Sequence, residues 1–203
     1  MTHFTNTGNP IDFPKSIDEI NDFIDGVTAR LENMSDEEYE NLGKSMLKHT
    51  KGNLLDLAEA GEFDVIVQGC NCFNTMGGGI AREIATRYPQ AAGVDRMTTR
   101  GDYNKLGTWT VAPSSNSLTE CKFFIINAYT QYNMSTGEDV FEYTAFDLIC
   151  QKLHKAYGTK RIGLPYIGMG LAGGDKDTIM EQIEYFAIRV AESGGSVTLV
   201  EFG

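Results

Sequence analysis

The chain has few features that assign a class at once. None of its stretches holds about 18 consecutive apolar residues, so no transmembrane helix is expected. Residues 1–14 are polar and lack the apolar segment of a secretory signal. Lys and Arg total 17 against 28 Asp and Glu, which gives a net charge of −11. A surface this acidic repels nucleic-acid backbones and anionic membranes, so neither is expected as a partner, and a protein partner is not identified.

Cysteine is also scarce. The four cysteines, Cys70, Cys72, Cys121 and Cys150, show no disulfide-framework spacing, which favours reduced thiols and a cytoplasmic location. The Cys70-x-Cys72 pair lacks a second ligand pair and a nearby histidine, which disfavours a zinc site. The chain has neither a C-x5-R phosphatase loop nor a G-x4-G-K-[ST] nucleotide loop. No metal and no cofactor are therefore expected.

The most informative stretch is residues 63–88. It begins with a β-branched and aromatic run at 63–67, typical of a buried strand, and ends in helical spacing at 80–88, before Pro89. Between them, Gly77, Gly78 and Gly79 open the helix. Unpaired amides at a helix start and close backbone approach at glycine favour an anion site, most often for phosphate. A plain tight turn is the alternative reading.

A second glycine-rich loop follows a later strand. Residues 168–173 match G-x-G-x-x-G, but only one further strand follows, whereas a dinucleotide-binding fold needs several. We therefore interpret the loop as a second phosphate cradle facing the first, an arrangement that suits a pyrophosphate. Asp175-x-Asp177 resembles a phosphatase motif but is better explained as an acidic helix start. His154, in mid-helix, is expected to be a surface or satisfied residue.

The hydrophobic pattern predicts an α/β chain. An N-terminal region carries a helix over 16–31 and a second one opened by a Ser35–Glu38 capping box. Strands then alternate with helices, which predicts a layered domain with a largely parallel sheet and ligands at the carboxyl ends of its strands. The expected strands are 46–51, 63–67, 108–112, 122–128, 161–166 and 197–202, the expected helices are 52–58, 80–88, 140–157 and 175–192, and the expected loops include 95–105 and 129–138.

Several of these segments together resemble a macrodomain. They are Gly-Asn-Leu-Leu at 52–55, Gly-Cys-Asn-Cys at 69–72, Met-Gly-Gly-Gly-Ile-Ala at 76–81, Arg-Tyr-Pro at 87–89 and the run at 165–174. The likeness is strongest to the ADP-ribose 1''-phosphate phosphatase branch, of phage and bacterial type. It covers residues 45–203 and implies a three-layer α/β/α macrodomain with a mixed, largely parallel central sheet. Residues 1–44 form an N-terminal helical extension outside it.

The resemblance also implies a ligand and its site. ADP-ribose, or its 1''-phosphate, would bind between the two glycine loops, with Asn71 facing the distal ribose as the catalytic residue. Asn53 stands where an aspartate usually reads adenine. The second loop lacks the aromatic residue found there in many macrodomains, and Tyr129 or Tyr132 could substitute. The implied ligand-binding set is Asn53, Leu54, Asn74, Thr75, Met76, Gly77, Gly78, Gly79, Ile80, Ile167, Gly168, Met169, Gly170, Leu171, Ala172, Gly173 and Tyr132.

Three functions follow from the resemblance. The first is a metal-independent phosphatase that hydrolyses ADP-ribose 1''-phosphate to ADP-ribose and phosphate. The second is a hydrolase that removes ADP-ribose from protein or nucleic-acid adducts. The third is a module that binds ADP-ribose without turnover. Neutral amides position groups rather than transfer protons, so catalysis at this site would depend on orientation and on charge held by amides.

Overall fold

The computed structural model describes residues 3–4, 10–11, 34–117, 119–134 and 139–203, and it divides into two compact units, 1–41 and 42–203. In the first unit, β1 (His3–Phe4) pairs antiparallel with β2 (Pro10–Ile11). The helix expected over 16–31 lies outside the described residues. The expected capping box is present: the Glu38 amide donates to the Ser35 hydroxyl, and the Ser35 amide donates to the Glu38 carboxylate. It opens α2 (Asp36–Met46).

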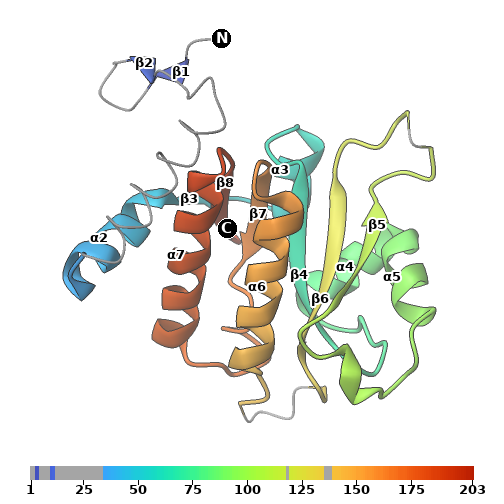
Figure 1. Ribbon diagram of the computed structural model, residues 1–203. Coiled ribbons are helices and arrows are strands. Elements are labelled where there is room, and N and C mark those ends of the chain that lie inside the picture. Colours follow the sequence, from blue (N-terminus) through green and yellow to red (C-terminus); the bar gives the residue numbers. More distant parts are fainter. Residues whose placement is uncertain (1–2, 5–9, 12–33, 118, 135–138) are drawn as a thin grey trace. The chain divides into compact units, whose positions relative to one another are not determined.

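The second unit is built on a six-stranded sheet (Figure 1). Its strand order is β3-β8-β7-β4-β6-β5, and every neighbouring pair is parallel except β5–β6. The mixed, largely parallel sheet expected from the sequence is therefore confirmed. The strands are β3 (Leu47–Lys51), β4 (Val65–Asn71), β5 (Trp109–Pro113), β6 (Phe124–Gln131), β7 (Arg161–Pro165) and β8 (Ser196–Glu201).

Helices cover both faces of this sheet and make three layers. Side chains of a strand alternate between its faces, so Val65 and Val67 join the hydrophobic cluster under α6 and α7, whereas Ile66 joins the one under α3, α4 and α5. Figure 1 shows α6 and α7 side by side on one face, with α4 and α5 on the other. The helices are α3 (Leu54–Glu59), α4 (Gly79–Arg87), α5 (Pro89–Arg96), α6 (Tyr143–Tyr157) and α7 (Lys176–Glu192). None of the helices in the described ranges is long and apolar enough to cross a membrane.

Some expected boundaries were wrong. Pro89 ends one helix but also occupies the first turn of α5, where its missing amide costs nothing. The expected loop over 95–105 includes the end of α5 and the short 3-10 helix η1 (Tyr103–Lys105). The expected loop over 129–138 begins later, because β6 continues to Gln131. The helix expected from residue 140 begins at Tyr143, since Phe141 forms a β-bridge with Gln131.

Candidate functional site

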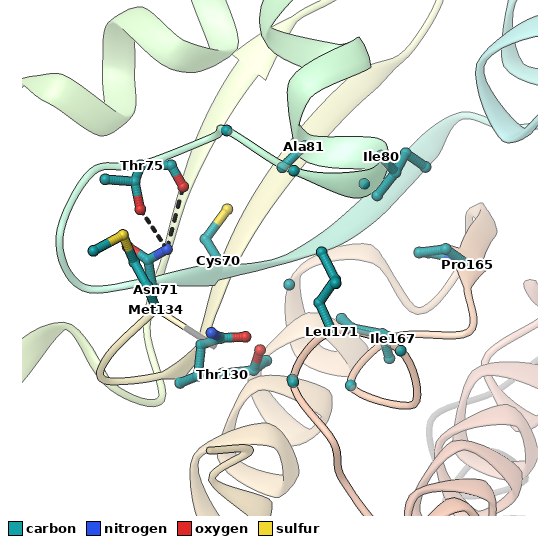
Figure 2. Close-up of a pocket in the computed structure, with 18 of the residues that line it drawn as sticks. Cys70, Asn71, Thr75, Ile80, Ala81, Thr130, Met134, Pro165, Ile167 and Leu171 are labelled. Carbon is teal, nitrogen blue, oxygen red and sulfur yellow. Dashed lines mark hydrogen bonds between the residues drawn. The ribbon is translucent and has the colours of Figure 1, made fainter. Parts of the chain in front are cut away.

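A cavity of about 580 Å³ opens at the carboxyl ends of β4, β6 and β7 (Figure 2). Three stretches of chain form its walls: the end of β4 with the first glycine loop, the end of β6, and the second glycine loop. Its lining consists of Gly69, Cys70, Asn71, Thr75, Gly77, Gly78, Gly79, Ile80, Ala81, Thr130, Gln131, Met134, Pro165, Tyr166, Ile167, Gly168, Gly170, Leu171 and Ala172.

The first glycine loop joins β4 to α4 and presents open backbone. Gly78 is the N-cap of α4, and no side-chain hydrogen bond caps the first amides of the helix there. Gly79 has φ +51°, a conformation that L side chains rarely adopt. At Gly69 a Cβ would lie 2.9 Å from the Thr130 hydroxyl, so glycine lets the strand end pass close to β6. The loop therefore offers amides and little side-chain bulk to the cavity.

Asn71 is held rigidly at the end of β4. Its Nδ2 donates to the Thr75 hydroxyl at 2.7 Å and to the Thr75 carbonyl at 3.2 Å, as the dashed lines in Figure 2 show. Its Oδ1 accepts the amide of Phe73 at 2.9 Å. Both Nδ2 hydrogens are therefore used, while Oδ1 keeps one lone pair that can accept a further hydrogen bond.

The second glycine loop is closely packed at its start. Gly168 has φ +77°, and a Cβ there would lie 2.5 Å from the Phe141 ring, so only glycine fits. Asp175 then caps α7 by accepting the amide of Thr178 at 2.9 Å, as expected from the sequence. Leu171 is 68% exposed, and its Cδ1 would be 3.1 Å from a Cβ on Gly78, so its side chain bridges the two loops. Figure 2 shows Leu171 extending from the second loop toward the first.

The structure brings together most of the residues that the sequence placed at the site. Eleven of them line the cavity: Asn71, Thr75, Gly77, Gly78, Gly79, Ile80, Ile167, Gly168, Gly170, Leu171 and Ala172. The others lie outside its lining: Asn53, Leu54, Asn74, Met76, Met169, Gly173 and Tyr132.

Asn74 turns away from the cavity. With φ +57° its side chain donates to the carbonyl oxygens of Asp95 and Thr98, and its Oδ1 accepts from Lys105 Nζ at 2.8 Å. Lys105 is itself buried and also lies 3.5 Å from the Asp95 carboxylate. The Asn74 side chain therefore has a structural role: it fastens the first glycine loop to the end of α5 and to the segment that follows it.

Asn53 caps a helix. Its Oδ1 accepts the amides of Leu55 and Asp56 at the start of α3, and its Nδ2 donates to Glu83 at 2.9 Å. Both polar atoms of the side chain are therefore engaged away from the cavity. To reach Asn53 Oδ1, an adenine amino group would have to displace the longer of the two capping hydrogen bonds, the one that the Asp56 amide donates at 3.3 Å.

Neither tyrosine considered as the aromatic partner lines the cavity. The Tyr132 hydroxyl donates to the Gly101 carbonyl at 3.0 Å, and its ring packs edge-on against Phe73. Tyr129 is buried, and its hydroxyl donates a hydrogen bond to the Asp95 carboxylate at 2.8 Å. Burial raises the pKa of the Tyr129 hydroxyl. The lining instead has the aromatic ring of Tyr166, directly after β7, which lies in the run at 165–174 but was not predicted to bind ligand.

The sequence also missed the wall supplied by β6. Thr130, Gln131 and Met134 line the cavity because β6 continues past the predicted strand end. The signal was the apolar run that leads into Tyr129 and Thr130, both of which are buried. The lining also includes Gly69, Cys70, Ala81 and Pro165, which lie in the segments that resemble a macrodomain but were not predicted to bind ligand.

The lining has little capacity for acid–base chemistry. Among its described residues only Cys70 and Tyr166 are ionisable, and no Asp, Glu, His, Lys or Arg is present. Burial, reinforced by the Asp95 carboxylate, raises the pKa of the Cys70 thiol, so the thiol stays protonated. Across the described ranges, no three His, Cys, Asp or Glu side chains are grouped to hold a metal ion. An anion in the cavity would therefore be held by backbone amides and neutral side chains.

The chain is 31% identical over 140 residues to an uncharacterized 17.5 kDa protein from the tk-vs intergenic region of Enterobacteria phage T4, and the match covers 66% of this chain and 85% of that protein. The chain belongs to the family of this phage protein. No protein-family model matches it.

Solved macrodomains share the fold of this chain. The macrodomain of Mycobacterium tuberculosis DarG has a TM-score of 0.55 at 20% identity, covering 77% of this chain and 96% of that one. A Trypanosoma brucei macrodomain in complex with ADP-ribose also has a TM-score of 0.55, at 13% identity, covering 77% of this chain and 63% of that one. The three-layer α/β/α macrodomain fold expected from the sequence is confirmed.

Proposed function

We propose that this chain binds ADP-ribose 1''-phosphate in the cavity between its glycine loops and hydrolyses it to ADP-ribose and phosphate without a metal. The observation that carries the proposal is the position of Asn71, fixed in the wall of the cavity beside the open amides of the first loop. Support comes from the shared fold with a macrodomain solved in complex with ADP-ribose. The glycine-lined wall suits a diphosphate, which needs several amides within reach at once.

In this proposal the ligand lies across the strand ends. The amides of the two loops hold the pyrophosphate, Asn71 meets the distal ribose, and the adenine lies toward Asn53 and Leu54 at the start of α3. Asn74, Met76, Met169, Gly173 and Tyr132 would then act by supporting the loops, because they lie outside the cavity lining.

The proposed reaction is attack by water on the 1''-phosphorus. The bond from phosphorus to the ribose oxygen breaks, its electron pair stays on that oxygen, and the water proton moves to the departing oxygen as the sugar hydroxyl is restored. The free lone pair of Asn71 Oδ1 accepts a hydrogen bond from the water or from a ribose hydroxyl and so fixes the angle of attack. The loop amides stabilise the negative charge of the 1''-phosphate as it is released from the ribose.

The test is phosphate release from ADP-ribose 1''-phosphate by the wild type and by Asn71→Ala, with the ADP-ribose affinity of each measured by calorimetry. Because Asn71 also holds Thr75, the affinity measurement separates loss of chemistry from damage to the loop. Turnover by the wild type, with a variant that binds but releases at least tenfold less phosphate, supports the proposal. An Asn71→Ala variant that retains full turnover contradicts the role of this residue.

A second candidate is a module that binds ADP-ribose and turns nothing over. It is favoured by one observation, the lack of any carboxylate, histidine or lysine among the described residues of the lining. The same experiment separates the two candidates. Binding by the wild type without phosphate release supports the module, and release of ADP-ribose from a modified acidic side chain or terminal phosphate would then test the adduct hydrolase.

A further inference from the structure

One buried hydroxyl in the cavity lacks a partner. Among the described residues, three buried side-chain atoms make no hydrogen bond: Gln68 Oε1, Gln182 Oε1 and Thr130 Oγ1. Of these three residues only Thr130 lines the cavity, and it is 1% exposed. An unpaired hydroxyl at such a position destabilises the ligand-free protein, because burial removes its hydrogen bonds to water and no hydrogen bond within the protein replaces them.

The position of this hydroxyl is fixed by the sheet. Thr130 lies near the end of β6, and its β-branched side chain has restricted χ1 freedom. A Cβ at Gly69 would be 2.9 Å from Thr130 Oγ1 and 3.1 Å from Ile167 Cγ1, so the hydroxyl lies directly over the end of β4 and beside the second glycine loop. Figure 2 shows Thr130 on the floor of the cavity, with Leu171 and Ile167 on one side and Asn71 on the other.

The described polar groups nearby make no hydrogen bond to this hydroxyl. Both Nδ2 hydrogens of Asn71 go to Thr75, and its Oδ1 accepts from Phe73. Gln131 directs its Nε2 to the Asn133 carbonyl at 2.8 Å. Valine has nearly the same shape as threonine and would fill this space without an unpaired polar atom. The hydroxyl therefore points to a polar ligand group.

The order of the strands indicates which end of the ligand lies near Thr130. Thr130 lies on β6, next to the strand that carries Asn71. The register shifts here, so that Tyr129 pairs with Cys70 and Gln131 with Asn71, and Thr130 lies between the two pairs. Asn53 follows β3, which β8, β7 and β4 separate from β6. Resting on the proposed function, we infer that the Thr130 hydroxyl hydrogen-bonds the distal ribose of ADP-ribose, a positioning contact that ADP, which lacks this ribose, does not make.

The test compares Thr130→Val with Thr130→Ser by calorimetry, using ADP-ribose and ADP as ligands, and records the melting temperature of each ligand-free protein. Valine removes only the hydroxyl, and serine keeps it. Loss of one neutral hydrogen bond predicts ADP-ribose binding about five- to tenfold weaker in Thr130→Val. Thr130→Ser should stay within about twofold of the wild type, and ADP affinity should be the same in all three proteins within that range. The ligand-free Thr130→Val protein should melt at or above the wild-type temperature.

Three results would overturn the inference while the wild type still binds ADP-ribose. They are unchanged ADP-ribose affinity in Thr130→Val, an equal loss for ADP and ADP-ribose, and a lower melting temperature for the ligand-free variant, which would show that the hydroxyl has a structural partner. A wild type that binds neither ligand would instead refute the proposed function, so the two failures are distinguishable.

Discussion

Lys105→Met should be among the most destabilising single changes in this chain. Lys105 is buried beside Asp95, with Nζ 2.8 Å from Asn74 Oδ1, 3.2 Å from the Cys72 carbonyl and 3.5 Å from the Asp95 carboxylate. The same ammonium lies 4.2 Å from the centre of the Tyr129 ring. Methionine keeps much of the apolar stem but removes the charge and all of these hydrogen bonds.

The size of the effect follows from burial. Asp95 is 2% exposed, and without Lys105 its carboxylate keeps the Tyr129 hydroxyl but has no paired cation among the described residues. Breaking a buried ion pair by removing one partner costs about 3–5 kcal/mol, since the remaining charge stays buried and uncompensated. At roughly 2–4 °C per kcal/mol for a chain of this size, the melting temperature should fall by roughly 6–20 °C.

The assay is urea unfolding with a matched control. Lys51→Met makes the same substitution in an exposed pair, where Lys51 lies 3.3 Å from Glu201, and should cost about 0–1 kcal/mol. Asp95→Asn combined with Lys105→Met should recover at least half of the loss, because no buried charge then remains. A Lys105→Met loss no larger than that of Lys51→Met would refute the reasoning.

Further predictions concern the second glycine loop and the thiols. Gly168→Ala should cost about 2–4 kcal/mol of unfolding free energy, because the residue has φ +77° and its Cβ would meet the Phe141 ring, whereas Gly170→Ala, with nothing within 4 Å, should cost little. Chemical denaturation of both variants checks this, and equal losses would contradict it. Iodoacetamide at pH 8 should label Cys121, which is partly exposed, in the folded protein and spare Cys70, because burial raises the Cys70 pKa above its usual value and limits access to the thiol. Mass spectrometry of the labelled peptides reads this out, and rapid labelling of Cys70 would show that the strand end opens.

The fold could be predicted because its signals are local and agree with one another. Each strand is a short apolar run, and the N-cap of α7 at Asp175 follows directly from its acidic side chain before an apolar helical pattern. The two glycine loops could be placed at one edge of the sheet, since parallel strands share the direction of their carboxyl ends.

The errors arose where tertiary contacts decide the outcome. Lys105 and Asp95 looked like loop residues because charged side chains are almost always exposed, yet they form a buried pair. Asn74 was expected to contact ligand because it shares a loop with Asn71, and the sequence did not show that its side chain hydrogen-bonds Asp95, Thr98 and Lys105. Only three-dimensional packing reveals these partners.

Thr130 is a candidate functional residue that the sequence alone did not indicate. A threonine that follows an apolar strand carries no sequence signal of function. It becomes significant only when the structure shows that its hydroxyl is buried in the lining of the cavity without a partner.

The measurement that tests the central claim most directly is calorimetric titration of ADP-ribose into the wild type, Gly77→Glu and Gly93→Glu. A Cβ at either glycine would meet nothing within 4 Å, so both variants should fold; Gly77 lines the cavity, and Gly93 lies in α5, outside it. A carboxylate near the pyrophosphate repels it by about 1–3 kcal/mol at an effective dielectric constant near 20. The account predicts one bound ADP-ribose per wild-type and Gly93→Glu chain, and affinity at least about fivefold weaker for Gly77→Glu. No binding by the wild type, or equal binding by all three proteins, would contradict it.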